Sequence, residues 1–129
     1  NNEAVFEEIQ PLAKQVKLLG VTYLTSWTSE ERFGITNTSM NLMWRNHLDR
    51  ISPYGFSGII CSASDIENIP NLERHYIKVC PGIGKNKGQV RTVTAKQAVE
   101  LGADYLVIGR TITQAKDPVQ ALLDIKESL

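Results

Sequence analysis

The chain contains few of the residues from which metal and redox sites are built. Its 129 residues include two cysteines and two histidines. Cys61 and Cys80 lack CxxC spacing, and each lies inside an apolar run, where a cysteine is usually a small buried hydrophobe. His47 and His75 share no HxxxH or carboxylate spacing. We therefore expect no metal ion, no redox site, and surface or structural roles for both histidines.

The sequence also lacks an excess of either charge and any long apolar run. Fourteen Lys and Arg residues balance fourteen Asp and Glu residues, so no overall field favours nucleic acid or an anionic membrane surface. No apolar run reaches the roughly 18 residues that a membrane span needs. The first residues, Asn1-Asn2-Glu3, are polar and acidic, unlike the start of a signal peptide. The expectation is a soluble, cytoplasmic protein.

Helical periodicity alternates with short apolar runs along the chain. In the first segment apolar residues recur every three or four positions, which predicts a helix, although Pro11 is unfavourable inside one. Gly20 is expected to close this helix or to lie in the short turn after it. Predicted helices cover residues 3–19, 41–51, 65–72, 95–101 and 118 to the C-terminus. Predicted strands cover residues 21–25, 58–61, 76–80 and 105–108.

Local signals fix several of these boundaries. Thr94 and Gln97 match the capping box, in which the two side chains satisfy each other's backbone amides. Gly102 is a typical residue just past a helix C-terminus. Asp117 and the proline after it supply an N-cap and a first helical residue for the last helix. Ser64 is expected to cap the short helix at 65–72.

The alternation of helix and strand predicts an α/β protein with a parallel sheet. Four- or five-residue strands that are apolar on both faces are typical of sheets covered by helices, and the spacings allow right-handed crossovers. No linker or low-complexity segment interrupts residues 1–129, so we expect one domain. A complete (β/α)8 barrel needs about 200 to 250 residues. If these are barrel units, about half of them are missing or come from another chain.

The stretch from residue 78 to 112 carries the chemistry. One predicted strand ends at Pro81-Gly82, Gln89 follows in a Gly-rich loop, and the next strand ends at Gly109-Arg110. In a barrel these would be strands seven and eight, whose ends commonly bind phosphate. Gly109 lets backbone approach an anion, Arg110 offers a bidentate fork, and Gln89 adds an amide donor. Taken singly, such a glycine is usually a turn and such an arginine a solvated charge.

Several segments resemble, in the same order, orotidine 5′-phosphate decarboxylase, and most closely its bacterial branch. They are LTS at 24–26, GIICSA at 58–63, PGI at 81–83, QVRTVT at 89–94 and GADYLVIGRTIT at 102–113. The last segment is the most specific, and together they cover essentially the whole chain. The resemblance implies the C-terminal half of a TIM barrel, beginning at the fourth helix and supplying strands five to eight.

The resemblance also implies a reaction and a set of substrate contacts. The family decarboxylates orotidine monophosphate to uridine monophosphate (UMP) without a cofactor. Carried over by motif, Thr25 and Ser26 lie near the pyrimidine and ribose, and Gln89, Gly109 and Arg110 hold the phosphate. Closure of the loop over the phosphate would spend remote binding energy on the reacting centre.

The sequence departs from the family pattern in three ways. Gly84 stands where the family often has an arginine, and the loop before Gln89 is several residues shorter. The D-x-K-x-x-D signature that supplies the family's catalytic lysine is absent, since Asp124-Ile125-Lys126 is followed by Leu129 at the final position. We therefore expect no catalytic residue in this chain and no carboxy-lyase activity from the chain alone.

The sequence supports two hypotheses about function. The first is a decarboxylase half-barrel that binds the nucleotide but lacks the catalytic Lys/Asp set. The second is a noncatalytic phosphate-binding or scaffold half-barrel. Four parallel strands outside a closed barrel leave two open edges, so we expect either a homodimer or pairing with a missing N-terminal half.

Overall fold

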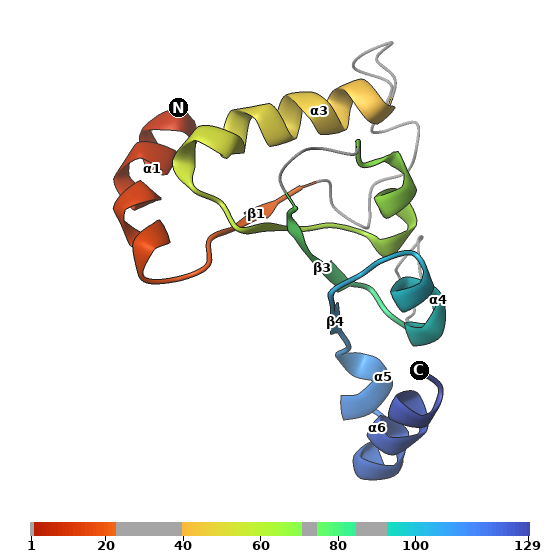
Figure 1. Ribbon diagram of the computed structural model, residues 1–129. Coiled ribbons are helices and arrows are strands. Elements are labelled where there is room, and N and C mark those ends of the chain that lie inside the picture. Colours follow the sequence, from red (N-terminus) through yellow and green to blue (C-terminus); the bar gives the residue numbers. More distant parts are fainter. Residues whose placement is uncertain (1, 23–39, 71–74, 85–92) are drawn as a thin grey trace.

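Four parallel strands form the centre of the protein. The computed structural model describes residues 2–22, 40–70, 75–84 and 93–129 (Figure 1). The strands stand in the order of the sequence, β1-β2-β3-β4. They are β1 (Leu19–Val21), β2 (Gly58–Ile60), β3 (Ile77–Pro81) and β4 (Tyr105–Val107). Parallel pairing of consecutive strands is the arrangement of a segment of a (β/α) barrel, so the predicted fold class is confirmed.

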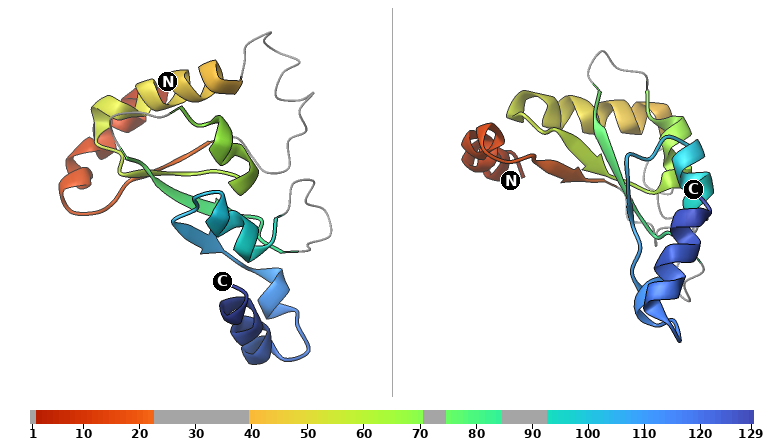
Figure 2. Two further views of the ribbon diagram at one scale, coloured as in Figure 1. Left: turned by 45° about the vertical axis from the view of Figure 1, so that its right-hand side comes forward. Right: turned by 60° about the horizontal axis from the view of Figure 1, so that its bottom comes forward.

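Helices connect the strands. They are α1 (Asn2–Ile9), α3 (Met40–Ile51), α4 (Ala95–Glu100), α5 (Arg110–Thr113) and α6 (Pro118–Glu127), with 3-10 turns η1 (Gln10–Lys14), η2 (Ser52–Tyr54) and η3 (Ala63–Asn68). The helix predicted over 41–51 is confirmed as α3. The two ends of the chain lie far apart, because α1 flanks β1 and α5 and α6 lie beyond β4 (Figures 1 and 2).

The hydrophobic core lies on one face of the sheet. It joins α3, the strands and α4 through residues such as Trp44, Ile59, Cys80 and Ala98, each at most 1% exposed. The opposite face is uncovered at both edges of the sheet. There the register aligns Val21 with Ile60, Ile60 with Val79, and Val79 with Tyr105. Val21 and Tyr105 are 61% and 57% exposed, so this face presents apolar side chains to solvent.

The first predicted helix is wrong in its length. α1 ends at Ile9 and passes into η1, with Pro11 in the first turn of η1. Proline lacks the amide that a continuing helix would need, which accounts for the break. Gly20, expected to close the helix or its turn, is instead a buried residue of β1, paired with Ile59. The predicted strand 21–25 thus starts two residues early, at Leu19, and residues 23–25 lie outside the described part.

The helix predicted over 65–72 with Ser64 as its cap is also wrong. A 3-10 helix begins at Ala63 after Ser62, and the Ser64 hydroxyl lies 2.9 Å from the Ser62 Oγ. Its end at Asn68 has a local cause. Ile69 precedes Pro70 and is extended (φ −75°, ψ 121°), as the residue before a proline is forced to be.

The other local signals are confirmed. The Thr94 hydroxyl accepts from the Gln97 amide at 3.2 Å, and the Gln97 side chain accepts from the Thr94 amide at 3.0 Å. Gly102 follows α4 with φ 95°. The Asp117 carboxylate accepts from the amides of Val119 and Gln120 at 3.1 and 3.0 Å. Within the described ranges, no helix is long and apolar enough to cross a membrane.

Candidate functional site

The carboxyl ends of β3 and β4 lie side by side and define the candidate site. Their last residues, Pro81 and Val107, are partners in the sheet register. Beyond them the chain continues through residues 82–84 on one side and 108–110 on the other (Figure 1). Parallel α/β proteins bind ligands at this edge because all the strand-to-helix loops meet there.

The segment after β3 is held on two sides. On one side, Ile83 forms a β-bridge with Val93, and the Gly84 amide donates to the Val93 carbonyl at 2.9 Å. On the other, the Thr111 hydroxyl donates to the Ile83 carbonyl at 3.4 Å. Gly84 has φ 89°, and a Cβ built on it would lie 2.5 Å from the Thr111 Oγ1. Here a residue with a side chain would be both strained and blocked.

Gly109 and Arg110 stand at the opposite side of the same edge. Apart from its two chain neighbours, no heavy atom of the described residues lies within 4 Å of the position that a Cβ on Gly109 would take, so these residues leave the space beside its backbone open. The Gly109 carbonyl accepts from the amides of Ile112 and Thr113 at 2.9 and 3.1 Å, which sets the short turn of α5. Arg110 begins that turn and is exposed.

The ion pairs found in the described ranges lie elsewhere. They join Asp104 to His75 and Lys78, and Arg110 takes part in neither. An exposed guanidinium next to open backbone can bind a phosphate oxygen through charge-assisted hydrogen bonds. Of the five predicted substrate contacts, Gly109 and Arg110 therefore share one edge of the sheet. Thr25, Ser26 and Gln89 lie outside the described residues, so their placement stays a prediction.

The start of β4 carries an electrostatic cluster at the other end of the strands. The Asp104 carboxylate accepts from the Lys78 amide at 2.7 Å and lies 3.5 Å from the Lys78 Nζ and 3.8 Å from the His75 Nε2. Burial opposes the charged form, but the amide of Lys78 and the nearby cations outweigh it and hold the pKa of Asp104 below its usual value. Residues at this end of barrel strands serve stability.

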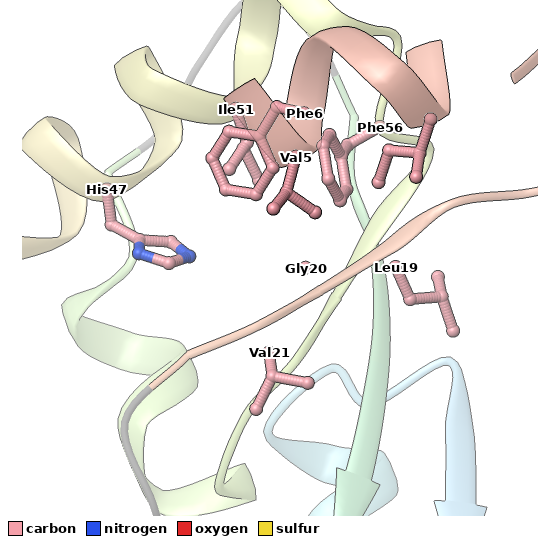
Figure 3. Close-up of a pocket in the computed structure, with 9 residues that line it drawn as sticks. Val5, Phe6, Leu19, Gly20, Val21, His47, Ile51 and Phe56 are labelled. Atoms are coloured by element: carbon pink, nitrogen blue, oxygen red, sulfur yellow. The ribbon is translucent and has the colours of Figure 1, made fainter. Parts of the chain in front are cut away.

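A hollow of about 360 Å³ lies between α1, α3 and β1, away from the carboxyl ends of β3 and β4 (Figure 3). Its walls are almost wholly apolar, and Gly20 in the middle of β1 contributes no side chain. The residues that line the hollow are Val5, Phe6, Ile9, Leu19, Gly20, Val21, His47, Ile51 and Phe56. His47 is the one polar residue, and burial together with the charge of Arg50 lowers its pKa, which favours the neutral imidazole. The sequence did not predict this hollow, because it depends on how α1 lies over β1.

Cys61 and Cys80 face each other in the core. Their Sγ atoms are 4.0 Å apart, both cysteines are reduced, and both side chains are buried. The contact with Cys80 and the burial of the thiol raise the pKa of Cys61. The prediction that both are small buried core residues is confirmed. The described residues contain no group of His, Cys, Asp or Glu that could hold a metal ion.

The four-stranded parallel sheet is one half of a (β/α) barrel, with Gly109 and the exposed Arg110 at the carboxyl end of its last strand. The model of the orotidine 5′-phosphate decarboxylase / HUMPS family matches residues 3–125. The chain belongs to this family.

Individual relatives agree with this assignment. The chain is 42% identical over 126 residues to an orotidine 5′-phosphate decarboxylase of Lactococcus lactis subsp. cremoris (strain MG1363), covering 91% of the chain and 53% of the relative. It is 39% identical over 133 residues to one of Vibrio vulnificus, covering 95% of the chain and 56% of the relative.

Solved structures give the same answer for the fold. The crystal structure of orotidine 5′-phosphate decarboxylase from Lactobacillus acidophilus matches with a TM-score of 0.63 and 32% identity, over 87% of this chain and 48% of that one. The enzyme structure from Sulfolobus solfataricus, 23% identical, matches with a TM-score of 0.63 over 98% and 54%. The chain spans about half the length of the relatives it matches.

Proposed function

We propose that this chain is the nucleotide-binding half of an orotidine 5′-phosphate decarboxylase. This carboxy-lyase converts orotidine monophosphate to UMP and CO2 in pyrimidine biosynthesis. The observation that carries the proposal is the open backbone at Gly109 beside the exposed Arg110, at the carboxyl edge of a parallel sheet. Relatives that are 38–43% identical to this chain over the aligned stretch are named for this reaction.

The proposed binding mode follows from the chemistry of the edge. A phosphate dianion would lie in the open space at Gly109, with Arg110 donating two hydrogen bonds to its oxygens. Gln89 would add an amide donor from the neighbouring loop, and Thr25 and Ser26 would reach the pyrimidine and ribose. No cofactor is part of this proposal.

The chemical step needs groups that this chain lacks. The Lys/Asp set implied by the family would come from the N-terminal half of the barrel, so the chain alone would be inactive. Two features support a partner half. Among the described strands, β1 and β4 each pair on one side only. Apolar residues of α6 such as Val119 and Leu122 are 70% and 45% exposed. Both the open edges and the apolar faces would be covered in a closed barrel.

We favour the N-terminal half over a second copy as the partner, because the relatives are about twice as long as the stretch they share with this chain. In this proposal residues 1–129 act as one domain. We place the protein in the cytoplasm, where the buried Cys61 and Cys80 would remain reduced.

The binding claim is tested by calorimetry with UMP and uridine, which differ by the phosphate. We expect the chain to bind UMP more tightly than uridine, and Arg110→Ala to reduce UMP affinity about 10- to 100-fold, the cost of losing a charge-assisted hydrogen-bonding group. Arg45→Ala, which removes an exposed arginine of α3, is the matched control and should change neither affinity. Equal affinities of the wild-type chain for the two compounds would refute the phosphate site.

A further inference from the structure

We propose that Thr111 is a positioning residue for the phosphate site, and that Gly84 is glycine because Thr111 occupies the space beside it. The inference rests on the proposed function, since it concerns how the same site is held in place. Thr111 follows Arg110 directly and lies in the single turn of α5. Whatever fixes Thr111 therefore fixes the backbone from which Arg110 extends.

The partner of Thr111 is a firmly held part of the fold. Its hydroxyl donates to the carbonyl of Ile83 at 3.4 Å, across 28 residues of sequence. Ile83 is 1% exposed, belongs to the core, and is bridged to Val93. The hydrogen bond therefore connects the exposed turn of Arg110 to a residue that is packed in the hydrophobic core.

Gly84 closes the contact from the other side. Its missing Cβ would stand 2.5 Å from the Oγ1, 3.1 Å from the Cγ2 and 3.3 Å from the Cβ of Thr111. The Oγ1 of Thr111 thus overlaps the position of an alanine Cβ, and the other two atoms crowd it. The Gly84 backbone has little freedom to retreat, because its amide donates to the Val93 carbonyl at 2.9 Å. A side chain at position 84 would push Thr111, and with it the turn of Arg110, away from β3.

Gly84 and Gly109 lie at the same edge of the sheet, but glycine is needed at the two positions for opposite reasons. The space beside Gly84 is filled by Thr111, whereas the space beside Gly109 is open. We infer that the first glycine lets the two strand ends approach each other, and that the second leaves room for the ligand. The departure of Gly84 from the arginine common in the family is then coupled to the side chain at position 111.

The test compares the ratio of uridine to UMP dissociation constants across variants of the chain. Thr111→Val keeps the shape of the side chain but removes the hydroxyl, and should lower the ratio about tenfold, the effect of one lost hydrogen bond. Thr111→Ser keeps the hydroxyl, so its ratio should stay close to that of the wild-type chain. Gly84→Ala should reproduce the Thr111→Val phenotype. Thr113→Val makes the same substitution at an exposed position of the same turn and should leave the ratio unchanged.

A double-mutant cycle separates positioning from general destabilisation. If Thr111 acts through Arg110, adding Thr111→Val to Arg110→Ala should cost no further UMP affinity. Additive losses, or equal losses of UMP and uridine affinity in Thr111→Val, would assign Thr111 a merely structural role and overturn the inference. A wild-type chain without preference for UMP would refute the proposed function and this inference together. A preference that survives intact in both Thr111→Val and Gly84→Ala would refute this inference alone.

Discussion

Asp104 and Lys78 join the starts of two neighbouring strands through a reciprocal pair of hydrogen bonds. The Lys78 amide donates to the Asp104 carboxylate at 2.7 Å, and the Asp104 amide donates to the Lys78 carbonyl at 3.0 Å. The Lys78 ammonium lies 3.5 Å from the same carboxylate. One aspartate thus holds both the backbone and the side chain of a residue in β3, at the end of the sheet opposite the candidate site.

This arrangement predicts a specific pH dependence. The folded protein holds the pKa of Asp104 below its usual value, so the ionised carboxylate stabilises the fold at neutral pH. That stabilisation is present above the unfolded-state pKa and is lost as the pH falls through the lower folded-state pKa. Asp104→Asn should therefore lower the free energy of unfolding by roughly 1 kcal/mol at pH 7. The difference should shrink towards zero below the usual carboxylate range.

Chemical denaturation at several pH values measures this effect. Asp49→Asn removes an exposed aspartate of α3 and serves as the control. A deficit in Asp104→Asn that is the same at pH 7 and at the lowest pH where the protein folds would show that the charge of Asp104 does not stabilise the fold.

Cys61 and Cys80 should be unreactive towards thiol reagents in the folded protein. Cys61 and Cys80 are 1% and 0% exposed, so a reagent cannot reach either thiol in the folded protein. The contact with Cys80 and burial also raise the pKa of Cys61. A disulfide reagent such as Ellman's reagent should label them only as fast as the protein opens, and at once in denaturant. Ser128→Cys, on the exposed C-terminal turn, gives the reference rate of an accessible thiol. Rapid labelling of both native cysteines at that rate would contradict their burial.

The capping box before α4 should contribute measurably to stability. Thr94→Ala removes the hydroxyl that accepts from the Gln97 amide and should lower the free energy of unfolding by about 1 kcal/mol. Thr94→Ser keeps the oxygen and should recover most of the loss. Thermal unfolding followed by circular dichroism compares the three proteins. Identical midpoints for Thr94→Ala and the wild type would mean that the box contributes nothing to the stability of this fold.

Features set by a few neighbouring residues were predictable from the sequence. The capping box at Thr94, the glycine after α4 and the Asp117-Pro118 start of α6 each depend on contacts within four residues, and all were predicted correctly. The end of η3 before Pro70 has an equally local cause, although the prediction of a helix over 65–72 did not use it.

Features set by pairing across the sheet were not predictable in the same way. A glycine after a helical pattern indicates a turn, yet Gly20 lies inside β1, because Leu19 and Val21 pair with β2 and Ile51 packs against the position. The contact between Gly84 and Thr111 joins residues far apart in sequence. The motif at Gly109-Arg110 could be found from its residue types, whereas what holds it in place became visible only in the fold.

The central claim is that this chain carries half of a decarboxylase active site. The most direct test measures the loss of orotidine monophosphate by absorbance, first with the chain alone and then after refolding it with an N-terminal half from a relative that carries D-x-K-x-x-D. We predict no decarboxylation by the chain alone, and decarboxylation by the reconstituted barrel that falls sharply when this chain carries Arg110→Ala. Turnover by the chain alone, or a reconstituted barrel that forms but stays inactive, would contradict the account.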